Sequence, residues 1–356
     1  MSLSKYINKI NLGDNVQILK DIESNSVDLI FADPPYNMTL EKELIRYEGT
    51  KYNGVDDDWD KYDSLEQYDQ ECKQWLTECL RVLKPNGSLW VIGSFQNIHR
   101  LGYILQDLNA WIINEIVWAK SNPTPNFAGT RFVNAQETLL WVVKNKKAKY
   151  TFNYKTMKQI NNGKQMKSVW TLPICSGNER LKDKNGNKVH STQKPLALLE
   201  RIILATSKVG DIVLDPFSGT GTTLVAAKKL ARQYLGIELD KNYWEHSVNR
   251  INSTVEDFSQ EDLKYAIYDK KPLKVSFKDL IDNNFISIED DVILDDLVLH
   301  FDKNGKLKYN SKLYTPNELC KKIYNKPTNA WTTLKINDKY IDFYRLKYRD
   351  SVAKDQ

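Results

Sequence analysis

The sequence predicts a doubly wound α/β fold, in which helices cover both faces of a largely parallel sheet. Stretches that read as buried strands alternate along the chain with stretches of helical spacing. In addition, a glycine-rich turn, "DPFSGTGTT" (Asp215 to Thr223), follows a strand and opens a helix. Ligands of such folds bind at the carboxyl ends of the strands. Polar residues that end a strand are therefore the first candidates for a functional site.

The length of 356 residues predicts one large domain or two unequal ones, and 41% apolar residues are enough for a real core. No apolar run approaches the roughly 18 residues of a membrane span, and the N-terminus lacks the apolar core of a signal peptide. The four cysteines are far apart and show no CxxC spacing. Neither a zinc site nor a disulfide framework is therefore expected, and a cytoplasmic location fits.

The first half of the chain supplies the first predicted strands and helices. Apolar runs predict strands at 26–35, 88–94, 112–118 and 137–144, and helical spacing predicts helices at 64–83 and 97–108. Ser64 is a candidate N-cap, and "KPNG" (84–87) is expected to stop the first of these helices. The acidic connection 38–62 is long enough to be functional or mobile.

The second half begins with a basic, polar segment, residues 144–189, which reads as an insertion and not as a core element. A second strand–helix–strand unit follows, with its strands at "GDIVLD" (210–215) and "QYLGIELD" (233–240), and the chain continues as a helix to about residue 252. Residues 253–274 read as a linker. From residue 275, short strands and helices alternate, which predicts a separate small domain.

The first strand ends in Asp33-Pro34-Pro35-Tyr36. The two prolines remove two backbone donors and fix the chain as it leaves the sheet, and their carbonyl oxygens are expected to stay free as acceptors. The stretch thus presents a carboxylate, bare carbonyls and a flat ring at one point. This combination suits the binding of a planar group that carries an amino substituent.

The glycine turn lets the backbone approach a ligand closely, and the helix N-terminus that follows favours an anionic group. The turn has neither the phosphate-binding pattern GxxxxGK[ST] nor the dinucleotide pattern GxGxxG. Glu238 ends the next strand, where an acid can accept both hydroxyls of a ribose. A nucleoside with a carboxylate-bearing tail, such as S-adenosylmethionine, fits these parts. The structural alternative is a tight turn beside a surface glutamate.

These motifs together resemble the β group of amino-methyltransferases that act on DNA. That family carries a D/N/S-P-P-Y/F/W motif and an F-x-G-x-G motif, here Asp33–Tyr36 and Phe217–Gly221. The resemblance implies a Rossmann-like, S-adenosylmethionine-dependent sheet in circularly permuted order, over residues 1–252. Its parts are a catalytic half (1–143), a target-recognition insert (about 120–189) and a cofactor half (190–252). A small C-terminal α+β DNA-binding domain (275–356) is implied as well.

One subgroup is especially similar. The stretches "ADPPYN", "WVIGSFQNIHR", "KSNPTPNFAGTRFVNAQETLLW" and "STQKP" resemble the cell-cycle-regulated adenine methyltransferase (CcrM) and HinfI-type modification methylases, which act on GANTC sites. The similarity extends over nearly all of residues 1–252 and is looser over 275–349.

The resemblance implies roles for individual residues. Asp33 and the Pro34 carbonyl would each accept one hydrogen of the adenine amino group, and Tyr36 would stack on a base extruded from the duplex. The catalytic residues are Asp33, Pro34, Pro35 and Tyr36. The cofactor-binding residues are Asp14, Asn15, Asp33, Thr192, Gln193, Lys194, Asp215, Phe217, Gly219, Thr220, Gly221, Thr222 and Glu238. The chemistry requires no metal.

Two basic stretches suit contacts with DNA phosphates. Residues 144–188 hold twelve Lys/Arg against two acids, and residues 303–349 hold twelve against three. Residues 279–302 hold eight acids and no Lys/Arg, so charge pairing within the C-terminal domain is the alternative for the second stretch. The candidate DNA contacts are Trp59, Asn122, Phe127, Arg131, Asn134, Lys164, Lys167, Arg180 and Trp331.

We therefore predict a site-specific methyltransferase that modifies N6 of adenine in double-stranded DNA, with base flipping. A homodimer is expected. Two roles stay open: a restriction-modification pair, with an endonuclease that acts on the same site without a stable complex, or cell-cycle control. Three other amino groups stay open as substrates: cytosine N4, RNA and a protein amide. A DNA-binding relative without catalysis is the alternative from another class.

Overall fold

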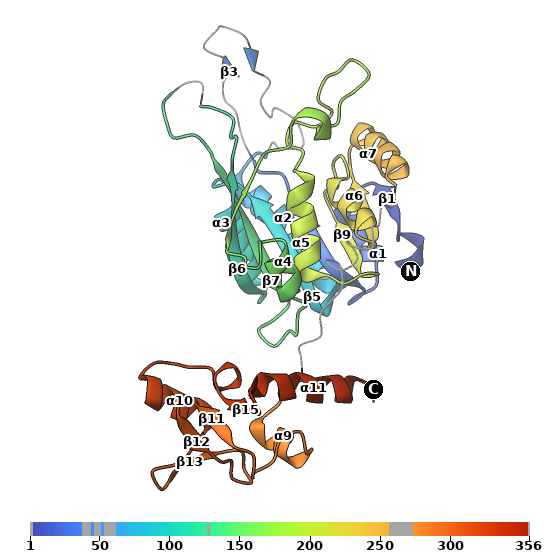
Figure 1. Ribbon diagram of the computed structural model, residues 1–356. Coiled ribbons are helices and arrows are strands. Elements are labelled where there is room, and N and C mark those ends of the chain that lie inside the picture. Colours follow the sequence, from blue (N-terminus) through green and yellow to red (C-terminus); the bar gives the residue numbers. More distant parts are fainter. Residues whose placement is uncertain are drawn as a thin grey trace. The chain divides into compact units, whose positions relative to one another are not determined.

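The computed structural model describes residues 3–37, 44–45, 51–52, 62–126, 129–255 and 273–354. The chain divides into two compact units, Met1–Asp269 and Lys270–Gln356, and each is treated separately (Figure 1). Two predicted DNA contacts, Trp59 and Phe127, lie outside the described residues, as does most of the acidic connection 38–62. Among the described residues, no helix is long and apolar enough to cross a membrane.

An eight-stranded sheet forms the centre of the first unit. Its strands, in spatial order, are β1 (Lys9–Leu12), β10 (Gln233–Glu238), β9 (Ile212–Asp215), β2 (Val27–Ala32), β5 (Leu83–Gly93), β7 (Gln136–Val143), β6 (Trp111–Lys120) and β8 (Val169–Leu172). β7 runs antiparallel to both of its neighbours, and the other neighbouring pairs are parallel. A separate short ladder joins β3 (Leu44–Ile45) to β4 (Lys51–Tyr52).

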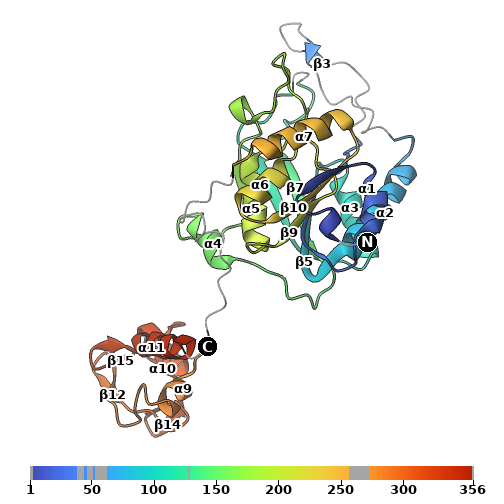
Figure 2. The same cartoon turned by 90° about the vertical axis from the view of Figure 1, so that its right-hand side faces the viewer.

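Helices cover both faces of this sheet, as the sequence predicted (Figure 2). One face carries α1 (Asn15–Asp21), α2 (Leu65–Val82) and α3 (Ile98–Asp107). The other carries α4 (Tyr154–Gln159), α5 (Leu196–Thr206), α6 (Thr222–Lys229) and α7 (Lys241–Ser253). Alternate residues of β2 serve the two cores, since Leu29 belongs to one cluster and Ile30 to the other. Burial on both faces explains the continuous apolar run of this strand.

The segment 144–189 differs from its prediction, because part of it belongs to the core. β8 pairs in parallel with β6 at the edge of the main sheet, where Trp118 lies opposite Trp170. Both Trp170 and Met157 of α4 are buried in the same hydrophobic cluster. The flanking residues are polar and gave no sign of this four-residue strand, so the expectation that the segment holds no core element was wrong.

The "KPNG" stretch follows the end of α2 as predicted, and it also belongs to a strand. Helix α2 does end at Val82, but Leu83 already pairs with Val27 of β2, and regular pairing resumes at Ser88 opposite Leu29. Residues 84–87 therefore form an irregularity within β5 and not a separate turn. Ser64 caps α2 as expected, since its side chain accepts a hydrogen bond from the Gln67 backbone N–H.

The second unit contains short helices and strands around its own core. Its helices are α9 (Phe277–Asp282), α10 (Pro316–Tyr324) and α11 (Ile341–Lys354). A four-stranded sheet has the order β12 (Leu297–Leu299), β11 (Val292–Leu294), β15 (Lys335–Ile336) and β16 (Lys339–Tyr340), and β13 (Leu307–Tyr309) pairs with β14 (Lys312–Tyr314). Capping boxes at Ser276 and Thr315 fix the starts of α9 and α10.

Candidate active site

Four neighbouring strands of the main sheet end at one edge and bring the predicted site residues together. β1, β10, β9 and β2 are adjacent, with Leu12 opposite Glu238 and Gly236 opposite Asp215. A cavity of about 970 Å³ opens at this edge, which is large enough for a nucleoside cofactor. Its lining includes Asp14, Asn15, Asp33, Pro34, Pro35, Tyr36, Thr192, Gln193, Lys194, Asp215, Phe217, Gly219, Thr220, Thr222 and Glu238.

The glycine turn shapes one end of the cavity. Gly219 and Gly221 have φ angles of 51° and 74°, in the left-handed region that favours glycine. Gly221 does not line the cavity; it is the N-cap residue of α6, and a Cβ there would lie 3.2 Å from the Cβ of Ser247. The turn thus requires glycine at this position for both conformation and space.

Glu238 is held in position by the backbone. Its Oε2 accepts a hydrogen bond from the Gly219 N–H (2.6 Å), and its Oε1 accepts one from the Asp240 N–H (2.9 Å). Each carboxylate oxygen keeps further lone pairs that can accept a ribose hydroxyl. The carboxylate acceptors of Glu238 therefore fit the ribose hydroxyls of S-adenosylmethionine.

Two titratable groups with shifted pKa values, Asp215 and His190, line the same cavity. Burial raises the pKa of Asp215 to about 7, although the Phe217 N–H donates to its Oδ1. Burial lowers the pKa of His190 to about 4, so this ring is neutral at physiological pH. Its Nδ1 accepts from the Thr192 N–H (3.1 Å), which puts the ring proton on Nε2. His190 was not among the predicted site residues; its position directly before "STQKP" was the available signal.

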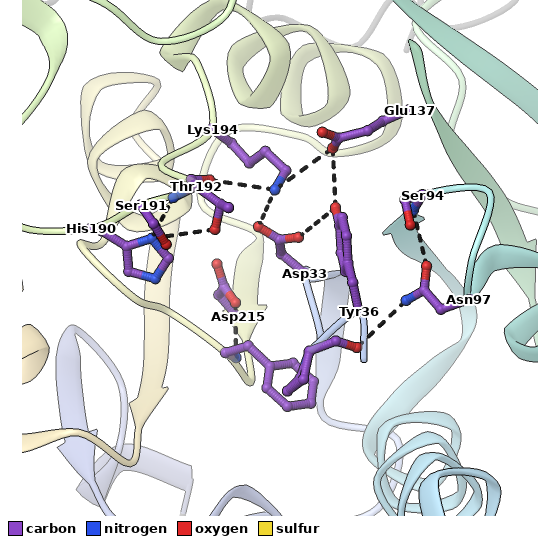
Figure 3. Close-up of polar contacts among 12 residues, drawn as sticks. Asp33, Tyr36, Ser94, Asn97, Glu137, His190, Ser191, Thr192, Lys194 and Asp215 are labelled. Carbon is purple, nitrogen blue, oxygen red and sulfur yellow. Dashed lines mark hydrogen bonds and ion pairs between the residues drawn. The ribbon is translucent and has the colours of Figure 1, made fainter. Parts of the chain in front are cut away.

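Asp33 lines the same cavity and belongs to a largely buried polar network (Figure 3). The Lys194 ammonium is 2.8 Å from Asp33 Oδ2, and the Tyr36 hydroxyl is 3.0 Å from Asp33 Oδ1. Burial raises the pKa of Asp33, and Lys194 partly offsets this effect. Although burial favours the neutral amine, Asp33 and Glu137 keep the pKa of Lys194 above its ordinary value.

Glu137, the second residue of β7, completes the network and was missed from the sequence. Its Oε2 lies 3.0 Å from the Tyr36 hydroxyl, and its Oε1 lies 2.7 Å from the Lys120 ammonium. Although burial favours the neutral acid, Lys194 and Lys120 together lower the pKa of Glu137. An acid at the start of an otherwise apolar strand was the available signal.

The two proline carbonyls are not equivalent, which corrects one prediction. The Pro35 carbonyl accepts a hydrogen bond from the Tyr68 hydroxyl (3.0 Å), and Asn97 Nδ2 lies 3.5 Å from it. Within the described parts of the chain, the Pro34 carbonyl accepts no hydrogen bond. The expectation of two free carbonyls was therefore wrong for Pro35, which instead anchors the motif to α2 and α3.

Comparison with known proteins identifies the family. A family model described as DNA methylase, covering N6 and N4 methyltransferases, matches residues 27–249. The chain is 45% identical to the type II methyltransferase M.HinfI of Haemophilus influenzae over 98% of both chains. The chain belongs to the N6/N4 DNA methylases. It is also 42% identical to M2.DpnII of Streptococcus pneumoniae, over 70% of this chain and 92% of that one.

A solved structure of an M1.HpyAVI–SAM complex matches this DNA methylase with a TM-score of 0.51 and 30% identity, over 68% of this chain and 98% of that one. The predicted α/β methyltransferase fold and the predicted cofactor are thereby confirmed. The protein is an S-adenosylmethionine-dependent DNA methyltransferase of the HinfI type.

The predicted DNA contacts of the methylase lie in different environments. Asn134, Lys164 and Lys167 are exposed. Asn122 Oδ1 accepts from the Ile174 N–H (2.8 Å), and Arg131 is exposed with its guanidinium 5.9 Å from the Phe95 ring centroid. Exposure leaves these side chains able to meet DNA, so their roles stay predictions.

Arg180 and Trp331 have structural partners. The Arg180 guanidinium donates to the carbonyls of Cys175, His190 and Ser191. These bonds hold the carbonyl groups of His190, which lines the cavity, and of the adjacent Ser191, while the DNA contact of Arg180 stays a prediction. Trp331 stacks on Phe277 with ring centroids 3.9 Å apart, and the Arg345 guanidinium lies 4.5 Å from the Trp331 ring.

Proposed function

We propose that this methylase transfers a methyl group to N6 of adenine within GANTC sites of double-stranded DNA. The observation that supports the proposal is the presence of two neighbouring acceptors in the cavity wall, the Asp33 carboxylate and the Pro34 carbonyl, of which the carbonyl accepts no hydrogen bond from the described residues. The opening Asp of the motif typifies N6 enzymes of adenine, whereas Ser typifies N4 enzymes of cytosine. The GANTC target follows from the resemblance to HinfI-type enzymes.

The adenine amino group is a poor nucleophile, because its lone pair is delocalised into the ring. Asp33 and the Pro34 carbonyl are each suited to accept one N6 hydrogen, which draws the nitrogen toward tetrahedral geometry and orients its lone pair. S-adenosylmethionine supplies an electrophilic methyl group on a sulfonium. The chain's own contribution is orientation, plus an acceptor placed where positive charge develops on nitrogen. The methylated amine then loses its proton to solvent.

The target adenine must leave the stacked duplex to reach Asp33. Tyr36 is proposed to stack on the extruded ring. Its side chain is buried at the cavity wall beside Asp33, and an aromatic face gives a flipped base a surface that replaces its lost neighbours. The acceptor pair would then hold the amino edge of the same base.

The basic stretches are proposed to hold the DNA backbone. In the second unit, the ammonium groups of Lys339 and Lys347 lie 4.6 and 4.8 Å from the ring centroid of Phe343, and Lys335 lies over the exposed Tyr340. Among the residues described from 273 onward, no Lys or Arg of the basic stretch 303–349 forms an ion pair with an acid of 279–302. This favours a polyanion partner over charge pairing within the unit.

The remaining assignments complete the proposal. Residues 1–252 form the methyltransferase domain and 275–356 the small DNA-binding domain, joined by a linker. The predicted catalytic, cofactor and DNA residues keep their roles. The enzyme works as a cytoplasmic homodimer, and a restriction endonuclease that acts on the same site forms no stable complex with it. A cell-cycle role like that of CcrM is the alternative to such a pair.

The test is methyl transfer to two duplexes, one with a single GANTC site and one without. Radiolabelled S-adenosylmethionine measures transfer, and digestion to nucleosides identifies the modified base. We expect N6-methyladenine in the first duplex and background in the second. N4-methylcytosine, or equal labelling of both duplexes, would contradict the proposed base or the proposed site.

A further inference from the structure

Two buried ionisable residues beside Asp33 have no part in the chemistry described so far. Glu137 and Lys120 have side chains that are 12% and 15% exposed, and they form an ion pair of 2.7 Å. They come from the adjacent strands β7 and β6. Burial of charged groups costs free energy unless they are paired and bonded. A fold that keeps them next to a catalytic carboxylate therefore suggests a function for them.

Both oxygens of Asp33 are already engaged in this structure. Oδ1 faces the Tyr36 hydroxyl at 3.0 Å, and Oδ2 is paired with Lys194 at 2.8 Å. The Lys194 ammonium also lies 5.1 Å from the centroid of the Tyr36 ring. An incoming base that bonds to Asp33 and stacks on Tyr36 thus competes with Lys194 at the carboxylate and near the ring.

Glu137 lies where it can receive the groups that Asp33 releases. Its Oε2 is 3.0 Å from the Tyr36 hydroxyl and 3.7 Å from the Lys194 ammonium, which is an ion-pair distance but longer than a hydrogen bond. Lys120 holds the other oxygen, Oε1, and so fixes the orientation of the carboxylate. A small movement of the Lys194 ammonium would exchange its bond to Asp33 for one to Glu137.

The charges of the cluster balance before and after such an exchange. Two carboxylates, Asp33 and Glu137, face two ammonium groups, Lys120 and Lys194. The exchange therefore moves no net charge in or out of a buried site, where an unpaired charge is costly. A neutral residue at position 137 would leave Lys194 no partner of equal strength and would keep it on Asp33.

We propose that Glu137 is a positioning residue for methyl transfer, which takes over Lys194 and the Tyr36 hydroxyl when the target base enters and so frees Asp33 for the amino group. The inference deepens the proposed function and rests on the role assigned there to Asp33. Glu137 itself does not need to touch the base.

The test compares Glu137→Gln, which keeps the shape and a hydrogen-bond acceptor but removes the charge, with Glu115→Gln. Glu115 is an exposed glutamate on the neighbouring strand β6 and serves as the matched control. Cofactor affinity, steady-state kcat, KM for DNA and the pH profile of kcat are measured for the wild type and both variants. A misplacement of about 1 Å at a reacting centre can cost about a hundredfold in rate.

We expect Glu137→Gln to lower kcat by about tenfold to a hundredfold, while cofactor affinity and KM for DNA stay within about threefold. The acid limb of the profile should also move to lower pH. The charged and titratable groups around Asp33 are Lys194, Glu137 and Tyr36, together with Asp215 at the end of β9, which interacts with Asp33 through its charge. Loss of the Glu137 charge removes one contribution that raises the pKa of Asp33. Glu115→Gln should change neither kcat nor the acid limb of its pH profile.

Three results decide against the proposal. An unchanged kcat, a loss of rate without a shift of the acid limb, or a loss confined to KM or cofactor affinity would each overturn it. If Glu137→Gln fails to bind cofactor, the variant Glu137→Asp is tested in its place, because it keeps the charge but has a shorter side chain. A lowered kcat with the acid limb of the wild type supports the positioning role. A wild-type kcat overturns it. A wild-type protein without methyl transfer to DNA would instead overturn the proposed function, and this inference with it.

Discussion

The raised pKa of Asp215 predicts that cofactor affinity depends on pH near neutrality. The carboxyl group is 3% exposed at the end of β9, and burial raises its pKa to about 7, with Asp33 and Glu238 contributing in the same direction. We expect Asp215 to bind the ammonium of the cofactor's amino-acid tail. Only the ionised carboxylate forms that ion pair, so protonation of Asp215 should weaken binding.

The magnitude follows from the ionised fraction of Asp215. With a pKa of about 7, about 3% of the carboxyl is ionised at pH 5.5 and about half at pH 7.0, so affinity should rise up to about 16-fold over this interval. An α-amino group has an ordinary pKa of about 7.7–8.0 and stays largely protonated throughout. Titration calorimetry with S-adenosylmethionine at four pH values measures the slope.

Two controls separate Asp215 from other groups. Asp215→Asn should bind weakly with a flat profile, and methylthioadenosine, which lacks the amino-acid tail, should bind the wild type with little dependence on pH. A flat profile for the wild type, or the same slope in Asp215→Asn, would refute the reasoning.

The same pKa predicts the opposite sign for the stability of the cofactor-free protein. The folded state raises the pKa of Asp215 from 3.8 to about 7, so its neutral form contributes stability that is fully present below pH 3.8 and is lost as the pH rises through 7. Asp215→Asn should therefore raise the melting temperature of the cofactor-free protein more at pH 8 than at pH 5.5. Scanning calorimetry at the two pH values measures the difference, and an equal change at both would contradict it.

Three further substitutions test other parts of the structure. Asp33→Ala should abolish methyl transfer while cofactor binding is kept or modestly weakened, as measured by tritium transfer and calorimetry; equal activity would discard Asp33 as the acceptor. Tyr68→Phe removes the donor to the Pro35 carbonyl and should lower the free energy of unfolding by about 1–3 kcal/mol in urea titrations. The double variant Lys339→Ala/Lys347→Ala should weaken DNA binding and reduce the salt dependence of log K by about 1.8, if each lysine contacts one phosphate.

Matched variants control for general effects of these changes. Tyr103, which is 64% exposed on α3, should tolerate Phe with no measurable loss of stability. Lys303 and Lys326 are exposed lysines elsewhere in the second unit, and their double alanine variant should leave the salt dependence closer to that of the wild type. Equal losses in test and control lysines would indicate a diffuse charge effect and not the Lys339–Phe343–Lys347 surface.

The elements that carry the cofactor cavity were predictable from local signals. A continuous apolar run that stops at Asp33, and a strand that stops before a glycine turn, each mark a strand end within a few residues. Parallel neighbours then bring such ends to one edge of the sheet. The strands β2, β9 and β10 and the helix α6 were found in this way, as were the candidate residues Asp33, Asp215 and Glu238 at the strand ends. The candidates Asp14, Asn15, Thr192, Gln193 and Lys194 came from the family resemblance.

The elements that were missed depend on partners far away in the chain. Val169–Leu172 forms the strand β8 because it pairs with β6 and buries Trp170. Four residues are too few for their sequence pattern alone to indicate a strand. The Pro35 carbonyl accepts a hydrogen bond from the Tyr68 hydroxyl, which lies 33 residues later in the chain. Such contacts appear only when separate elements pack together.

By itself, the sequence determined the order of the elements, the acceptor motif at Asp33 and the glycine turn, because each depends on residues next to one another. Tertiary structure alone decided that Glu137 joins Asp33 through the Tyr36 hydroxyl and that Lys120 pairs with Glu137, since the antiparallel pairing of β6 with β7 places Trp118 opposite Glu137 and leaves the end of β6 beside it. It also brought Lys194 to Asp33 from 161 residues away. Burial then strengthens the interactions among these charges, because electrostatic attraction is stronger where water is excluded. The linear sequence does not show which charges will be buried together.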